Sequence, residues 1–282
     1  MNNKLLGYKK YMNSLGQRHF FHMVTPSPWP FCTATNVFFI ALSAVMFMHN
    51  YKNGGVYLIL GFLNFLFILS LWFRDVIREG TFEGMHTKVV QKNLKFGFAL
   101  FIVSEIMFFF GFFWAFFHNA LAPAVEIGCI WPPIGINPIY PYKLPLLNTI
   151  ILLLSGVSIT VCHAAIRCAK TESLYKYFLV TLLFAIAFIF IQLFEYYTAA
   201  FAISDGIYGS VFYMLTGFHG FHVLVGAIFI LVCYIRALFG HFTTTHHVGF
   251  ECASWYWHFV DVVWLFSFIF VYCWGTWGYV FH

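Results

Sequence analysis

Hydrophobic residues form seven long runs along the chain, separated by short polar stretches. The runs cover roughly residues 31–49, 54–73, 95–118, 146–166, 175–201, 207–235 and 249–278. About 20 apolar residues in a helix cross a bilayer core of roughly 30 Å, and each run is close to that length or longer. The pattern therefore predicts an all-α, polytopic membrane protein with seven transmembrane helices.

The third run, residues 95–118, contains a single carboxyl group, that of Glu105. Phenylalanines lie four positions before it, three positions after it and seven positions to either side, so helical spacing surrounds it with aromatic rings. A charged side chain at this depth costs at least about 2.5 kcal/mol. We therefore expect Glu105 to be a buried carboxyl that is neutralised by a proton.

A stripe of mostly small residues recurs every seventh position on the same run, at Gly97, Ser104, Gly111 and His118. Small side chains at this spacing allow another transmembrane helix to approach closely. The stripe predicts that the third helix packs through its glycines.

Composition agrees with a membrane protein and excludes a soluble globular domain. The chain is 61% hydrophobic and 9% charged, and its mean hydropathy is +0.81. The net charge of +5 would suit a nucleic-acid partner in a soluble protein. In a membrane protein the positions of the positive residues indicate instead which side of the membrane each connection faces, so we expect no nucleic-acid partner.

Lys and Arg residues gather on one side of the predicted topology. Of the 15, all but Lys52 and Lys143 fall in the N-terminal arm or in connections on the same side as that arm. Because positive residues favour the cytoplasmic or matrix side, we place the N-terminus there and the C-terminus on the opposite side. We call the two sides the positive and the opposite side.

The predicted organisation has four parts. Residues 1–30 form a basic N-terminal arm without the apolar core of a secretory signal, and we interpret it as a tail on the positive side rather than a targeting arm. Residues 31–73 contain the first two predicted helices, residues 74–94 a charged connection, and residues 95–282 the other five predicted helices. A proline-rich and glycine-rich stretch, 119–145, predicts an ordered cap on the opposite side.

Thirteen histidines raise the question of a metal centre. Only one H-x-x-H pattern, His219 with His222, and one H-H pair, His246 with His247, are present, which is too few for a membrane di-iron enzyme. The seven cysteines form no C-x-x-C pair. These patterns predict no metal site in this chain, with haem on a single axial histidine as the open alternative, and we interpret the histidines as interhelical or head-group hydrogen-bonding residues.

Polar residues on the seventh run share one helical face. Glu251, His258 and Asp261 are separated by seven and three positions, which places them together on a helix. We expect a structural polar network that holds helices together. A proton relay along this face remains the alternative, and Glu195 at the end of the fifth run has the same two interpretations.

Charged and aromatic residues on the positive side suit lipid head groups. Residues 74–95 alternate in charge sign beyond Trp72, and Arg236 and several histidines lie at the same predicted depth. Arg and His at head-group depth match phospholipid phosphates. The alternative is an ordinary charged connection that only fixes topology.

Long motifs resemble the cytochrome c oxidase subunit III family. They include HMVTPSPWP (22–30), RDVIREGTFEGMHT (74–87), VQKNLKFGFALFIVSEIMFFFGFFWAFFH (90–118), WPPIGINP (131–138), TGFHGFHVLVG (216–226) and HHVGFECASWYWHFVDVVWLF (246–266). The resemblance covers nearly the whole chain after the first twenty or so residues. One departure is Tyr197–Ala200, which reads YTAA where many members read YEAP.

The resemblance implies a non-redox subunit beside subunit I and subunit II of an oxidase that passes electrons from cytochrome c to oxygen and pumps protons. Haem a, haem a3 and copper would lie in those partner subunits, and this chain would hold phospholipids. The first two helices would splay from the other five and leave a V-shaped, lipid-filled cleft. Glu105 would be the family's buried carboxyl, and the lipid-binding residues would be Trp72, Arg78, Glu79, His86, Arg236 and His246.

The resemblance also implies a location in the mitochondrial inner membrane, with the N-terminus in the matrix and the C-terminus in the intermembrane space, or else in a bacterial plasma membrane. Accessory subunits and phospholipids are further expected partners. Two other functions remain open: subunit III of a quinol oxidase, which usually lacks the first two helices, and a seven-span transporter, which would need a connected polar path.

Overall fold

The computed structural model describes residues 19–279. Within this range seven helices are long and apolar enough to cross a membrane, and no strand occurs, which confirms the predicted all-α architecture. Most of the predicted N-terminal arm, residues 1–18, lies outside the described residues. The chain forms two compact units that divide between Leu94 and Lys95.

The first unit contains a pair of helices, α2 (Trp29–Met48) and α3 (Gly54–Thr81), joined by a tight turn. Asn50 and Asn53 adopt the left-handed conformation there, with φ of 55° and 65°. At Gly54 an added Cβ would lie 2.7 Å from the backbone nitrogen of Phe47. The two helices therefore come into backbone contact directly after the turn, where only glycine leaves enough space.

Two helices extend well beyond the apolar runs that predict them. Helix α3 continues through the charged residues to Thr81, and α4 (Lys88–Leu121) begins seven positions before the third apolar run. The connection between them is only residues 82–87. Charged side chains end a hydrophobic run without ending a helix, because long Lys and Arg side chains reach water while the backbone keeps its own hydrogen bonds.

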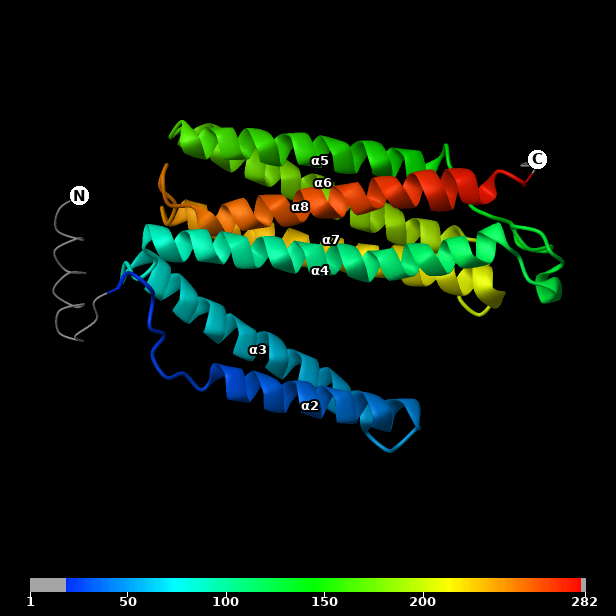
Figure 1. Ribbon diagram of the computed structural model, residues 1–282, viewed down its shortest axis with the longest axis horizontal. Coiled ribbons are helices and arrows are strands. Elements are labelled where there is room, and N and C mark those ends of the chain that lie inside the picture. The colour runs from blue at the N-terminus through cyan, green and yellow to red at the C-terminus, as the bar shows by residue number, and fades with distance from the viewer. Residues whose placement is uncertain (1–18, 280–282) are drawn as a thin grey trace. The chain divides into compact units, whose positions relative to one another are not determined.

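The second unit contains the remainder of α4 and four further long helices. These are α5 (Leu144–Arg167), α6 (Thr171–Thr198), α7 (Gly206–Leu238) and α8 (Val248–Phe266). Figure 1 shows them as long, roughly aligned helices. Helix α8 continues as a π-helix, η2 (Ser267–Cys273), and a short 3-10 turn, η3 (Trp274–Thr276).

Tryptophan side chains of α8 fill the centre of the second unit. Trp257 and Trp264 are fully buried, and each indole nitrogen donates a hydrogen bond to a hydroxyl of α5. Trp257 Nε1 donates to Ser155 Oγ at 2.9 Å, and Trp264 Nε1 donates to Thr149 Oγ1 at 2.9 Å. Large aromatic rings thus supply the packing, while their single polar atoms are satisfied across the helix interface.

The carboxyl group of Glu195 is enclosed near the end of α6. Its Oε1 accepts hydrogen bonds from Tyr272 Oη at 2.6 Å and from Gln192 Nε2 at 3.1 Å. Tyr272 belongs to the π-helix η2, so this segment brings its hydroxyl to α6. The contacts are those of a carboxyl group that joins two helices.

The small-residue stripe of α4 has no neighbouring helix among the described residues of the second unit. A Cβ added at Gly97 or Gly111 would meet no described atom within 4 Å, and Ser104 is exposed. Within the part of the second unit that the structure describes, no helix packs on this stripe, and the packing of α4 through its glycines stays a prediction. Instead α4 contacts its neighbours through aromatic rings on a different face, including Phe109 against Phe259 of α8 with ring centroids 6.0 Å apart.

We expect the indole hydrogen bonds between α5 and α8 to contribute measurably to stability. Trp257→Phe removes the donor to Ser155 and leaves space in the core, so it should lower the free energy of unfolding by about 1–3 kcal/mol. Trp255→Phe, at an exposed position on the same helix, is the matched control. Thermal unfolding in mild detergent measures both, and equal midpoints for the two variants would contradict this assignment.

Candidate functional site

Glu105 of α4 faces His222 of α7. His222 Nε2 lies 2.8 Å from Glu105 Oε2, and the Glu105 side chain is 21% exposed within this chain. The rings of Phe109 and Tyr256 pack around the imidazole, with centroids 4.9 and 6.3 Å away. The carboxyl group that the sequence places among phenyl rings therefore has a specific polar partner 117 positions away in the chain.

The hydrogen bond of the other ring nitrogen of His222, Nδ1, limits where the proton between His222 and Glu105 can lie. His222 Nδ1 lies 2.7 Å from the carbonyl oxygen of Phe218, and a carbonyl only accepts, so Nδ1 carries a hydrogen. A neutral His222 then presents a lone pair at Nε2, and Glu105 must donate. A charged His222 donates instead to a carboxylate. In both cases one proton lies between the two side chains and the pair as a whole is neutral.

Glu251, at the start of α8, belongs to a cluster near the positive end of the second unit. Its carboxylate forms an ion pair with Lys95 and lies 3.4 Å from His247 Nε2. His247 Nδ1 donates to the carbonyl oxygen of Thr243 at 2.8 Å, and His163 lies beside His247 with ring centroids 5.5 Å apart. One ligand atom each from His163, His247 and Glu251 falls within 4.8 Å of the others.

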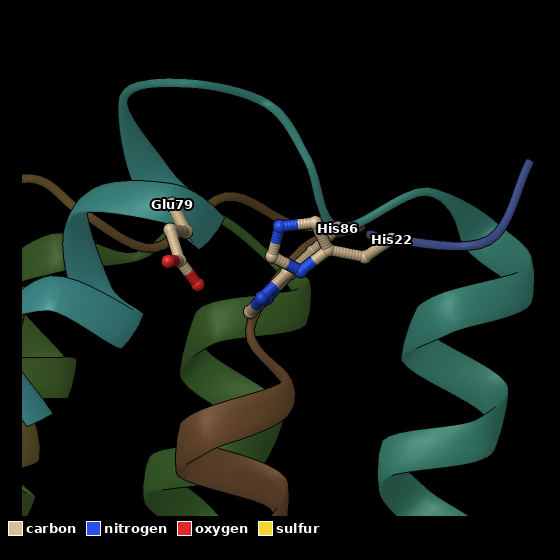
Figure 2. Close-up of side chains that lie close together, drawn as sticks. All are labelled: His22, Glu79 and His86. Carbon is tan, nitrogen blue, oxygen red and sulfur yellow. The ribbon is translucent and has the colours of Figure 1, made fainter. Parts of the chain in front are cut away.

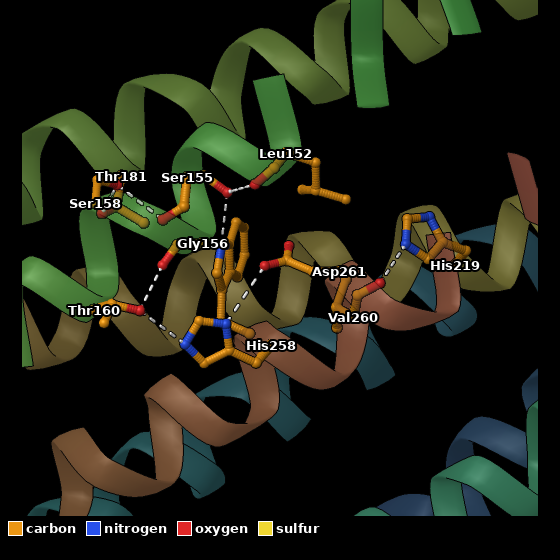
Figure 3. A network of polar contacts seen from close by, with 11 residues as sticks. Leu152, Ser155, Gly156, Ser158, Thr160, Thr181, His219, His258, Val260 and Asp261 are labelled. Atoms are coloured by element: carbon orange, nitrogen blue, oxygen red, sulfur yellow. Dashed lines mark hydrogen bonds and ion pairs between the residues drawn. The ribbon is translucent and has the colours of Figure 1, made fainter. Parts of the chain in front are cut away.

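Asp261 and His258 form a separate set deeper in α8, shown in Figure 3. His258 Nδ1 lies 3.7 Å from Asp261 Oδ2, and its Nε2 lies 3.4 Å from Thr160 Oγ1 of α5. At Gly156 an added Cβ would lie 2.6 Å from Asp261 Oδ2, so glycine lets this carboxyl group approach α5. Among the described residues no hydrogen bond or ion pair connects this set to Glu251.

Four predicted head-group residues belong to the first unit. Trp72, Arg78 and Glu79 lie on the last three turns of α3, and His86 lies in the connection to α4. Figure 2 shows the Glu79 carboxylate pointing toward the imidazole rings of His86 and His22. One ligand atom from each of these three residues lies within 4.8 Å of the others.

The other two predicted head-group residues belong to the second unit. The Arg236 guanidinium lies over the ring of Phe242, 4.7 Å from its centroid. His246 closes a turn with Thr243 through hydrogen bonds of 3.0 and 3.2 Å. Burial lowers the pKa of nearby His241, and the positive charge of Arg236 lowers it further, so His241 adds little positive charge at neutral pH.

The sequence does not predict the partners of four residues at these sites. They are His22, Lys95, His163 and His222. His222 stands in an H-x-x-H pattern with His219, yet His219 Nε2 contacts the carbonyl oxygen of Val260 instead, at 3.1 Å. His22 and His163 carry no local pattern at all. Only the lone Glu105 on its apolar helix signals that some polar partner must exist.

Comparison with known proteins finds one family. A family model described as cytochrome c oxidase subunit III matches residues 19–276. Proteins named "Cytochrome c oxidase subunit 3" from Chondrus crispus and Arabidopsis thaliana are 56% and 54% identical, over 260 and 259 residues. The alignments cover 92% of this chain in both cases and 95% and 98% of those relatives. The protein of the same name from Loxodonta africana is 50% identical over 260 residues, 92% of this chain and 99% of the relative.

The proton between Glu105 and His222 can be assigned by infrared spectroscopy. We expect the neutral arrangement, with the proton on Glu105, because apolar surroundings disfavour two separated charges. The difference spectrum between the unaltered protein and Glu105→Gln should then lose a protonated-carboxyl stretch, and His222→Phe should shift that stretch without abolishing it.

The matched control is Glu126→Gln, at an exposed acid in the short turn Val125–Ile127. It should remove carboxylate bands only. Loss of carboxylate bands alone in Glu105→Gln would show an ion pair with a charged His222 and contradict the neutral arrangement.

Proposed function

The chain belongs to the cytochrome c oxidase subunit III family, and on that basis we propose that it is a non-redox subunit of the oxidase. It supports subunit I and subunit II, with haem a, haem a3 and copper held by those partners. The observation that carries this proposal is the match along residues 19–276 together with 50–56% identity to relatives named for this subunit. Family membership sets aside the seven-span transporter.

We further propose that the chain lies in the mitochondrial inner membrane, with its N-terminus in the matrix. The asymmetry of Lys and Arg between the two sides supports this orientation. The organisms of the relatives, a red alga, a plant and an elephant, support a mitochondrial rather than a bacterial membrane.

We propose that residues on the positive side bind phospholipid head groups. Arg78 is exposed on the last turns of α3, and Trp72 lies on the same helix at a depth suited to an interfacial aromatic ring. Arg236 presents a planar guanidinium next to Phe242 at the end of α7. A guanidinium binds a phosphate with two parallel hydrogen bonds, so these groups match phospholipid chemistry. Lipids held here would guide oxygen toward the catalytic subunit.

A second proposed role is the collection of protons by acids on the positive side. Asp75 is the weaker candidate, because its oxygens accept hydrogen bonds from Trp29 Nε1 at 2.6 Å and from Arg74 at 3.0 Å, which stabilise the ionised form. Glu79 and Glu83 are the stronger candidates for collecting protons. Unchanged proton uptake by the oxidase after Glu83→Gln and Glu79→Gln together would count against this role.

Purification through a tag on this chain tests the assignment to the oxidase. Extraction in mild detergent should recover a complex with haem a in a fixed ratio to the chain, visible in its absorption spectrum. A colourless chain that stays alone under the same extraction would overturn the assignment.

Lipid retention tests the head-group residues separately. Arg236→Gln removes a charge-assisted contact with a phosphate, worth about 1.5–3 kcal/mol, so binding of one anionic phospholipid should weaken by about tenfold to a hundredfold. Lys52→Gln, at an exposed cation of the opposite side, is the matched control. Lipid mass spectrometry of the purified oxidase gives the count, and equal retention in both variants would contradict the role of Arg236.

A further inference from the structure

Three metal-binding side chains converge in the first unit from three separate segments. His22 lies in the stretch before α2, Glu79 on the last turn of α3, and His86 in the connection between α3 and α4. Their ligand atoms lie within 4.8 Å of one another, and the two imidazole rings stand edge to face with centroids 5.9 Å apart. Figure 2 shows the carboxylate and both rings turned toward a common point.

Two hydrogen bonds hold the segments that carry the histidines, and helix α3 carries Glu79. Thr87 Oγ1 donates to the carbonyl oxygen of Phe20 at 2.7 Å, which ties the stretch carrying His22 to the start of α4. Gln91 Nε2 donates to the carbonyl oxygen of His86 at 2.9 Å. The backbone that presents the three side chains is therefore held before any ligand binds, as a preorganised site requires.

Gly80 sets the approach of the His86 ring. A Cβ added at Gly80 would lie 2.7 Å from His86 Nδ1 and 2.9 Å from Cε1, closer than van der Waals contact permits. Glycine at this position lets the imidazole lie directly on the last turn of α3, beside the residue that carries the neighbouring ligand. A larger residue at this position would displace the ring.

We propose that His22, Glu79 and His86 form a binding site for a divalent transition-metal ion, with Zn²⁺ the best match. Two imidazoles and one carboxylate are a donor set that zinc accepts, with water in the fourth position of a tetrahedron. Ligand atoms around such an ion lie about 3.3 Å apart, given metal–ligand distances of about 2.0–2.1 Å. Small side-chain rotations close the present spacing to that value.

The consequence of binding is mechanical. A zinc ion would join the stretch before α2 to the end of α3, adding to the hydrogen bond of 2.6 Å between Trp29 Nε1 and Asp75. It would carry no electrons, since zinc has no redox chemistry. The site goes beyond the proposed lipid function, although Glu79 and His86 are shared with it.

Equilibrium dialysis of the intact, chelator-treated oxidase against radioactive zinc tests the site. Unaltered oxidase should bind one more equivalent per haem a than either His22→Gln or Glu79→Gln. Gly80→Ala keeps all three ligands but displaces His86, and should weaken binding of that equivalent at least about tenfold. Binding should also weaken as the pH falls, because the ligands must be deprotonated.

Two control variants separate this site from its neighbours. Arg78→Gln removes a proposed lipid contact and no metal ligand, so it should bind zinc as the unaltered oxidase does. His163→Gln, in the cluster with His247 and Glu251, should likewise keep the equivalent that depends on His22. His22 is outside the proposed lipid set, so His22→Gln should lose zinc and retain phospholipid.

Equal zinc binding in His22→Gln and the unaltered oxidase would overturn the proposal. The proposal would also fail if Arg78→Gln lost as much bound zinc as His22→Gln. Hydrogen exchange of the unaltered oxidase gives a test without any substitution. Zinc should slow exchange of backbone amides in residues 19–28, and exchange that zinc leaves unchanged would also count against the site.

Discussion

The need to satisfy every polar group within an apolar bundle governs the second unit. Hydrocarbon offers no hydrogen bonds, so a carboxyl or imidazole in a transmembrane helix must find its partner within the protein, and several of these partners lie on another helix. Glu195 meets Tyr272, Glu105 meets His222, and the indoles of α8 meet hydroxyls of α5. Each contact fixes the rotation of one helix against another, which apolar packing alone specifies weakly in lipid. The polar side chains are few, and they determine how the helices pair.

The sequence predicts the seven helices well because the signal for each is local. Length and hydropathy are properties of a single run, and a run that spans a bilayer has few alternatives to a helix. The ends are harder. Charged residues such as Arg74 and Glu79 end the apolar run 54–73 but continue α3, because the chain leaves the hydrocarbon there without losing its helical hydrogen bonds. Hydropathy locates the membrane rather than the ends of the helix.

The sequence predicts some residues of the candidate sites, but it does not predict which residue on another element each of them contacts. Glu105 is conspicuous as a lone acid, but nothing near it in sequence indicates His222. His22 and Glu79 are separated by the whole of α2 and most of α3, so no spacing rule relates them. The stripe at Gly97 and Gly111 has the same limit, because small residues signal that a helix is able to pack closely without identifying the neighbouring helix. Helical periodicity places residues on one element, and pairing between elements depends on the fold.

The contact between Glu105 and His222 also responds weakly to the voltage across a membrane. A proton that passes from one side chain to the other moves at most the 2.8 Å between Oε2 and Nε2, roughly a tenth of a hydrocarbon core about 30 Å thick. One charge crossing the whole membrane gains about 2.3 kcal/mol per 100 mV, so this shift gains about 0.2 kcal/mol, less than thermal energy. An energised membrane would therefore leave the position of this proton almost unchanged. Local packing around the two side chains, rather than the electric field, decides which of them holds it.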